Sequence, residues 1–122
     1  MTRPGSVATA KIAYAEVYAG LTRRQREGHL SAGQYASACR QFESDWRSYI
    51  RVDLGDEILV LARVLIQRHA LRGFDAIHLG SALSLRTALG EEITFGAADE
   101  RLLRAARAER LPVLNVETTK SA

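Results

Sequence analysis

The chain has little sulfur and no long uncharged hydrophobic run. Its 122 residues include a single cysteine, Cys39, which excludes an internal disulfide and a cysteine-rich zinc site. Cys39 is interpreted as a small residue of an amphipathic helix, because no activating base lies near it in the sequence. No stretch has the apolar length of a transmembrane helix or of a secretory signal, so we expect a cytoplasmic protein with no membrane association.

Glycine-rich phosphate-binding motifs are also absent. The chain has neither Gly-x-Gly-x-x-Gly nor a Walker loop, which argues against a Rossmann-type nucleotide binder. The 17 basic residues exceed the 14 acidic ones by only three, so charge permits a polyanionic partner without demonstrating one. The hydrophobic content of 47% argues against disorder, and the length fits a single domain, residues 1–122, around one core.

Glycines and helix-capping residues divide the chain into helix-like and strand-like segments. Residues 1–5 are predicted to be a loose end. Helices are predicted over residues 10–27, from Ser31 onward, and over 55–70, 74–89 and 99–109. Short strands are predicted over 7–9, 49–54, 93–95 and 111–116. Because strands alternate with helices, we expect an α/β fold with a parallel sheet and ligands at the carboxyl edge of its strands.

Three carboxylates occupy positions where a plain structural residue would be easier to accommodate. Asp75 follows Gly73 at the start of an apolar helical segment, and Asp99 repeats that arrangement. Each has a simpler explanation. Asp75 could be a first-turn residue favoured by the helix dipole, and Asp99 an N-cap that accepts the backbone N–H of Arg101 or Leu102.

Glu16 is harder to explain as a structural residue. On a helix it shares a predicted buried face with small and apolar side chains, namely Ile12, Ala13, Ala19 and Gly20. Burying a carboxylate there is costly without a cationic partner, and Arg23 is one candidate on the same face.

A site made only of Asp and Glu suits Mg²⁺ or Mn²⁺, which prefer oxygen ligands, and makes zinc a poor candidate. Glu16, Asp75 and Asp99 are therefore the predicted metal ligands, provided that they converge in the fold. Phosphodiester hydrolysis follows from such a site, because the ion activates a water and offsets charge on the phosphate. The general base stays open between a carboxylate and a metal-bound hydroxide.

Blocks along most of the chain resemble a known family. The blocks are Val7-Ala8-Thr9 leading into Ala15-Glu16-Val17, then Phe74-Asp75-Ala76-Ile77-His78-Leu79 with Ser81-Ala82-Leu83, then Phe95 to Asp99 followed by Glu100-Arg101-Leu102-Leu103. In this order they look like the PIN-domain ribonucleases, and in particular the VapC-type toxins of prokaryotic toxin–antitoxin pairs.

The resemblance implies a compact, PIN-like three-layer α/β/α sandwich that cleaves RNA internally with Mg²⁺ or Mn²⁺. It also implies a homodimer held inactive by a small antitoxin. Glu16, Asp75 and Asp99 match the family's catalytic acids position by position. His78 belongs to the motif, but we expect it to pack within the core or between helices.

The chain departs from the family pattern at two places. The family begins with a strand ending in Asp-x-Ser/Thr, whereas residues 1–6 contain no acid, so we expect the first strand and first ligand to be absent. A homodimer or swapped arrangement, a start assigned too far downstream, and a degraded remnant are the open explanations. The second departure is Ala97, where the family commonly has a Thr or Ser.

Two functions therefore remain as hypotheses. One is a metal-dependent endoribonuclease, fully active if the missing acid comes from upstream sequence or a partner chain. The other is a catalytically inactive PIN-like module that binds antitoxin or RNA. Several arginines could face phosphates, and none is assigned individually; they are Arg23, Arg24, Arg26, Arg72, Arg101 and Arg104. Tyr14 and Tyr18 are predicted to pack in the core or at a dimer contact rather than stack on a base.

Overall fold

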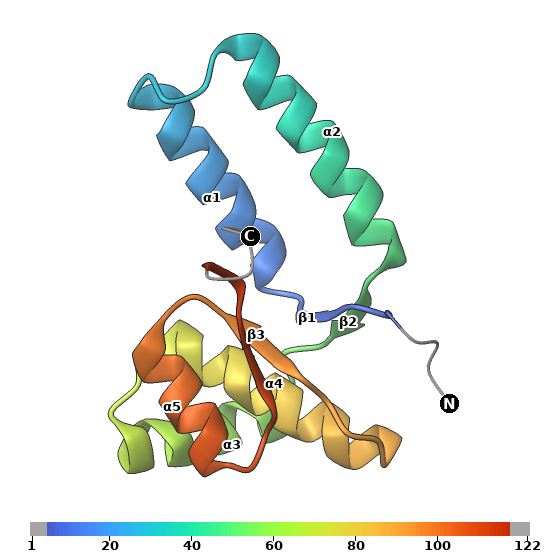
Figure 1. Ribbon diagram of the computed structural model, residues 1–122, viewed down its shortest axis with the longest axis vertical. Helices are drawn as coiled ribbons and strands as arrows, with labels where there is room; N and C mark the ends of the chain where they lie inside the picture. Colours follow the sequence, from blue (N-terminus) through green and yellow to red (C-terminus); the bar gives the residue numbers. More distant parts are fainter. Residues whose placement is uncertain (1–4, 118–122) are drawn as a thin grey trace. The chain divides into compact units, whose positions relative to one another are not determined.

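The computed structural model describes residues 5–117, which divide into two compact units, residues 5–53 and 54–117 (Figure 1). Most of the predicted loose end at residues 1–5 lies outside the described residues. The elements of the N-terminal unit are β1 (Ala8–Ala10), α1 (Ala13–Arg26), α2 (Ala32–Ser48) and β2 (Ile50–Val52). Those of the C-terminal unit are α3 (Asp56–His69), α4 (Gly73–Leu89), β3 (Phe95–Ala97), α5 (Glu100–Ala108) and β4 (Val113–Asn115).

The N-terminal unit pairs two short parallel strands, β1 and β2. Ala10 stands opposite Val52, and the Lys11 backbone N–H donates to the Val52 carbonyl at 2.9 Å. These ladder contacts hold Ala10 in the strand. Helix α1 therefore begins three residues later than predicted.

Local capping chemistry sets the turn between α1 and α2. Gly28 has a φ of +82°, a left-handed conformation that costs glycine little, and it follows the end of α1. Ser31 is the N-cap of α2, where its hydroxyl accepts the Gln34 backbone N–H and the Gln34 side chain accepts the Ser31 N–H. This reciprocal capping box fixes the start of α2 as predicted.

Aromatic rings join α1 to α2, which lie side by side (Figure 1). The Tyr14 ring lies 5.2 Å from Tyr18 and 5.1 Å from Trp46 between centroids, and Phe42 lies 5.7 Å from Trp46. The hydroxyls of Tyr14 and Tyr18 both donate to Oε2 of Glu43 on α2. The two tyrosines therefore pack between α1 and α2 and not in a buried core, since no residue of α1 is buried and Tyr14 is exposed.

Acid is expected to loosen this helix pair. Hydrogen bonds from Tyr14 and then Tyr18 hold the pKa of Glu43 below its usual value. A lowered folded-state pKa contributes stability above the unfolded pKa of about 4.3, and that stability is lost as the pH falls through the folded pKa. We expect the melting temperature, followed by circular dichroism, to fall below about pH 4 more steeply in the parent than in Tyr14→Phe/Tyr18→Phe. Parallel curves for the two proteins would contradict this role of Glu43.

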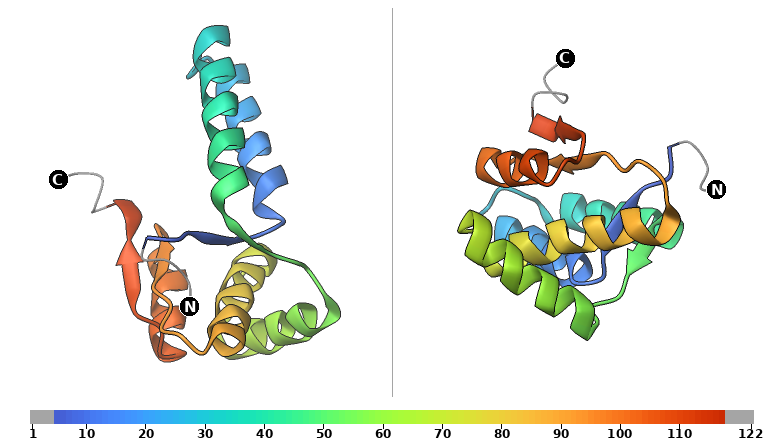
Figure 2. Two further views of the ribbon diagram at one scale, coloured as in Figure 1. Left: turned by 90° about the vertical axis from the view of Figure 1, so that its right-hand side faces the viewer. Right: turned by 90° about the horizontal axis from the view of Figure 1, so that it is seen from below.

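The C-terminal unit contains a second parallel strand pair, β3 with β4. Phe95 stands opposite Val113 and Ala97 opposite Asn115. Strand β3 begins two residues later than predicted, because Ile93 packs against the core whereas the ladder starts at Phe95. Helix α5 contacts both strands of the pair (Figure 2).

The core of the C-terminal unit lies between α3, α4, α5 and the β3–β4 pair. Its fully buried members include Leu65 from α3, Leu79 from α4 and Leu103 from α5. Helices α3 and α4 pack against each other (Figure 2). The one buried polar side chain among residues 54–117, Ser81, donates to the Ile77 carbonyl one turn earlier at 2.7 Å, which satisfies its hydroxyl.

The predicted α/β class with parallel strands is confirmed. The strands within residues 5–117 pair two by two, β1 with β2 and β3 with β4. No helix in this part of the chain combines the length and apolar character needed to cross a bilayer.

Candidate functional site

Asp75 lies in the first turn of α4. This helix begins at Gly73, after Arg72 in an extended conformation, and the Asp75 side chain is 22% exposed. The position is favourable for a carboxylate because the first-turn N–H groups and the helix dipole attract negative charge. The structural explanation of Asp75 therefore holds, and it leaves the carboxylate accessible.

Asp99 is the N-cap of α5 and follows the carboxyl end of β3, as predicted. Its Oδ1 accepts the Leu102 backbone N–H at 3.1 Å. This is the capping role anticipated from the sequence. The N-cap bond uses Oδ1, so Oδ2 of Asp99 takes no part in the cap.

Arg72 joins the two acids. Its Nε lies 3.2 Å from Asp75 Oδ2, and its Nη2 lies 3.6 Å from Asp99 Oδ2. One guanidinium therefore spans two carboxylates that stand 24 positions apart in the sequence and belong to different helices. Asp75 and Asp99 thus form, within the C-terminal unit, an acid pair that accommodates a cationic group.

Glu16 belongs to the other unit, where it lies in the first turn of α1. The sequence predicted a buried face for this helix, but none of the residues of α1 is fully buried, and Glu16 itself is half-buried. The expectation of a buried face was wrong, because the aromatic contacts between α1 and α2 bury no residue of α1 fully. The role of Glu16 as a third metal ligand stays a prediction.

The donor set of the acid pair fits a hard divalent cation. Two carboxylates already surround a positive group, and Mg²⁺ is commonly held by one or two carboxylates while waters and substrate phosphates complete its shell. Across residues 5–117, no three His, Cys, Asp or Glu side chains form a ready metal cluster. The pair is therefore a partial site that requires further oxygen donors.

Two polar side chains, Asn115 at the end of β4 and Glu100 at the start of α5, were not predicted as site residues. Asn115 ends β4, which is parallel to β3, and its Nδ2 lies 3.5 Å from Oε1 of Glu100 at the start of α5. The signal that could have found Asn115 is its place at the end of a predicted strand, because parallel strands end at the same edge of a sheet. Ala97, the departure from the family's Thr or Ser, packs its methyl against the core.

His78 lies half-buried in α4 with neighbouring core residues Ala76 and Leu79. The packing role predicted for His78 stays a prediction. A second histidine, His69, contacts a carboxylate. His69 at the end of α3 places Nε2 2.7 Å from Oε2 of Glu109, and Arg68 donates to the same oxygen at 2.7 Å.

Glu109 is thereby held in its ionised form. Burial by itself raises the pKa of this carboxyl, but the hydrogen bonds from His69 and Arg68 outweigh burial and lower it. The interaction also fixes the end of α3 against the end of α5. It forms one side of a small basic pocket.

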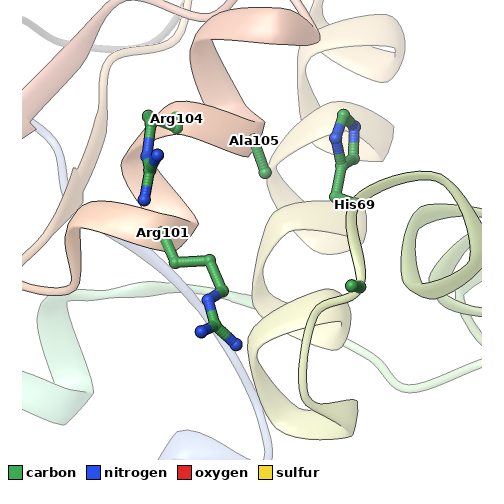
Figure 3. A pocket seen from close by; sticks show the side chains of 5 residues that line it. His69, Arg101, Arg104 and Ala105 are labelled. Atoms are coloured by element: carbon green, nitrogen blue, oxygen red, sulfur yellow. The ribbon is translucent and has the colours of Figure 1, made fainter.

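The pocket has a volume of about 280 Å³ and is lined by His69, Ala70, Arg101, Arg104 and Ala105 (Figure 3). In Figure 3 the two arginines project from α5, and His69 lies on the other side of Ala105. The pocket was missed by the sequence analysis, although the spacing of Arg101 and Arg104 by three residues places them on one helix face.

The C-terminal unit thus is an α/β structure that brings two carboxylates to one arginine, one of them after the carboxyl end of strand β3. Known proteins make the assignment more specific. The chain is 38% identical over 77 residues to Ribonuclease VapC45 of Mycobacterium tuberculosis (strain CDC 1551 / Oshkosh), and equally to Ribonuclease VapC49 of Mycobacterium tuberculosis (strain ATCC 25618 / H37Rv). In both cases the match covers 63% of this chain and 54% of the relative.

The resemblance to VapC-type PIN toxins that the sequence predicted is confirmed by these two relatives. The chain spans about half the length of the curated relatives it matches. No family model matches it.

Proposed function

We propose that the chain is an endoribonuclease of a toxin–antitoxin pair that hydrolyses RNA phosphodiester bonds with Mg²⁺ or Mn²⁺. The observation that carries the proposal is the guanidinium of Arg72, shared between Asp75 and Asp99 at 3.2 and 3.6 Å. It supports a cation site at these acids. Similarity to two proteins named ribonucleases supports the activity.

Asp75, Asp99 and Glu16 are the residues that would hold the ion. When bound, the ion supplies charge stabilisation at a phosphate oxygen and activation of a water. The N-cap bond of Asp99 orients its carboxylate, so that Oδ2 faces Arg72 without an ordering cost at the moment of binding. Asp75 is held in place by the first turn of α4.

Arg72 has a distinct role in this proposal. Its side chain is 76% exposed, so it can leave the acid pair at little cost in packing. It neutralises the two carboxylates when no other cation is present. Once displaced, it remains beside the site, where its five N–H donors suit a substrate phosphate.

Removal of divalent metal is expected to abolish RNA cleavage reversibly. A labelled single-stranded RNA would be incubated with the chain in EDTA and then with added Mn²⁺, and the products would be separated on a gel. We expect cleavage only after Mn²⁺ is restored. Asp99→Asn is the matched variant, because asparagine keeps the N-cap while removing the charge, and it should stay inactive at the same metal concentration.

Cleavage that persists in EDTA would contradict the metal-dependent mechanism. Absence of cleavage under all conditions, with RNA still bound, would favour the second hypothesis of an inactive module that binds RNA or antitoxin. An antitoxin partner, a homodimer, cytoplasmic localisation and a single domain over residues 1–122 belong to the same proposal through the family resemblance.

A further inference from the structure

The basic pocket of the C-terminal unit contains unpaired positive charge. Its lining includes two guanidinium groups one helical turn apart, on Arg101 and Arg104, and no acidic side chain. Within residues 54–117 neither arginine forms an ion pair, whereas Arg68, Arg72 and Arg107 each have a carboxylate partner. Charge that the unit does not neutralise is available to an external anion.

The wall opposite the arginines is fixed. His69 is only 14% exposed and is held by Glu109, whose own charge is shared with Arg68. Ala70, the C-cap of α3, has a left-handed backbone with a φ of +55° that ends the helix at the pocket wall. The small side chains of Ala70 and Ala105 leave the space between the charged groups free.

The chain links this pocket directly to the acid pair. Arg101 stands two residues after Asp99 at the start of α5, and Ala70 stands two residues before Arg72. Both pocket walls therefore continue into the two segments that carry the acid pair and its arginine. A strand of RNA with its scissile phosphate at Asp75 and Asp99 would place a neighbouring phosphate near Arg101.

We infer that the pocket lined by His69, Arg101 and Arg104 binds one backbone phosphate of single-stranded RNA next to the scissile bond. This inference rests on the proposed function. Guanidinium groups suit phosphate because their planar forks donate two parallel hydrogen bonds to its oxygens. Because Arg101 and Arg104 lie on one face of α5, we expect both guanidinium groups to contact the same phosphate rather than two separate phosphates.

The test measures RNA binding in EDTA, where cleavage does not interfere. A fluorescently labelled single-stranded RNA is titrated with the parent chain, with Arg101→Ala, with Arg104→Ala and with the double variant, at several salt concentrations. Loss of a charge-assisted phosphate contact should weaken binding roughly tenfold in each single variant. In each single variant the remaining arginine still holds the phosphate, so the slope of log affinity against log salt should become shallower by less than about 0.7.

The double variant distinguishes one phosphate from two. If both arginines hold the same phosphate, the double variant loses about 0.7 from the slope in total, whereas two independent contacts would cost about 1.4 and overturn the inference. The control is Arg63→Ala on the exposed side of α3, which removes the same charge outside the pocket and should leave the affinity within about twofold of the parent.

Equal losses in Arg63→Ala and the pocket variants would show that only net charge matters, and unchanged binding in the pocket variants would show that the pocket is not used. Either result overturns the inference. Binding measured in EDTA separates the inference from the proposed function, because the readout requires no cleavage. RNA binding that depends on the pocket in a chain that never cleaves RNA would refute the activity and leave the phosphate site standing.

Discussion

Replacing Asp75 with asparagine should lower kcat/KM for RNA cleavage at least about 100-fold, since even groups that only support a metal ligand contribute 10- to 100-fold. The substitution keeps the size and shape of the side chain and removes the charge that faces Arg72. A cleavage assay on labelled RNA at fixed Mn²⁺ gives the rate. Circular dichroism verifies that the variant remains folded.

Asp56→Asn is a matched control for this substitution. Asp56 also stands in the first turn of a helix, α3, and its loss costs the same helix-dipole interaction without touching the acid pair. We expect this variant to cleave RNA at the parental rate. Equal activity of the Asp75 and Asp56 variants would remove Asp75 from the site.

Replacing Leu79 with alanine should cost about 2–5 kcal/mol of unfolding free energy. Leu79 is fully buried where α4 meets the core of the C-terminal unit, so the substitution removes apolar contacts and leaves a cavity. Urea unfolding followed by far-ultraviolet circular dichroism measures the loss. A loss of this size is a large fraction of the stability of a small domain.

Leu59→Ala provides the comparison for Leu79→Ala. Leu59 lies on α3 and is 47% exposed, so the same chemical change there should cost less than about 1 kcal/mol. If the two variants unfold at the same urea concentration, the core assigned to α3, α4 and α5 is wrong.

Local chemistry made most helix ends predictable from the sequence. The capping box at Ser31, the glycine at Gly28, and the N-cap at Asp99 each act through side chains or backbone within a few residues. Such short-range interactions can be recognised from residue types and their spacing in the sequence. Boundaries that depend on a distant partner were placed less well, as the late starts of α1 and β3 illustrate.

The candidate site was predictable in its residue types and less so in its arrangement. Asp75 and Asp99 stood out because each follows a break before a helix, and the structure brings both to Arg72. No local pattern indicated that Arg72, rather than any other arginine, lies between them, because that depends on how α4 packs beside α5. The pocket at Arg101 and Arg104 requires the end of α3 as its second wall, which is also a tertiary contact.

Paramagnetic Mn²⁺ tests the convergence of the three acids most directly. Substoichiometric Mn²⁺ would be added to the isotope-labelled chain, and the broadening of each backbone amide resonance would be recorded by NMR. If the three acids share one ion, resonances around Glu16, Asp75 and Asp99 should broaden together, and Asp75→Asn should suppress the effect at all three. Broadening that spares any of these segments, or that is unchanged in Asp75→Asn, would contradict a shared ion.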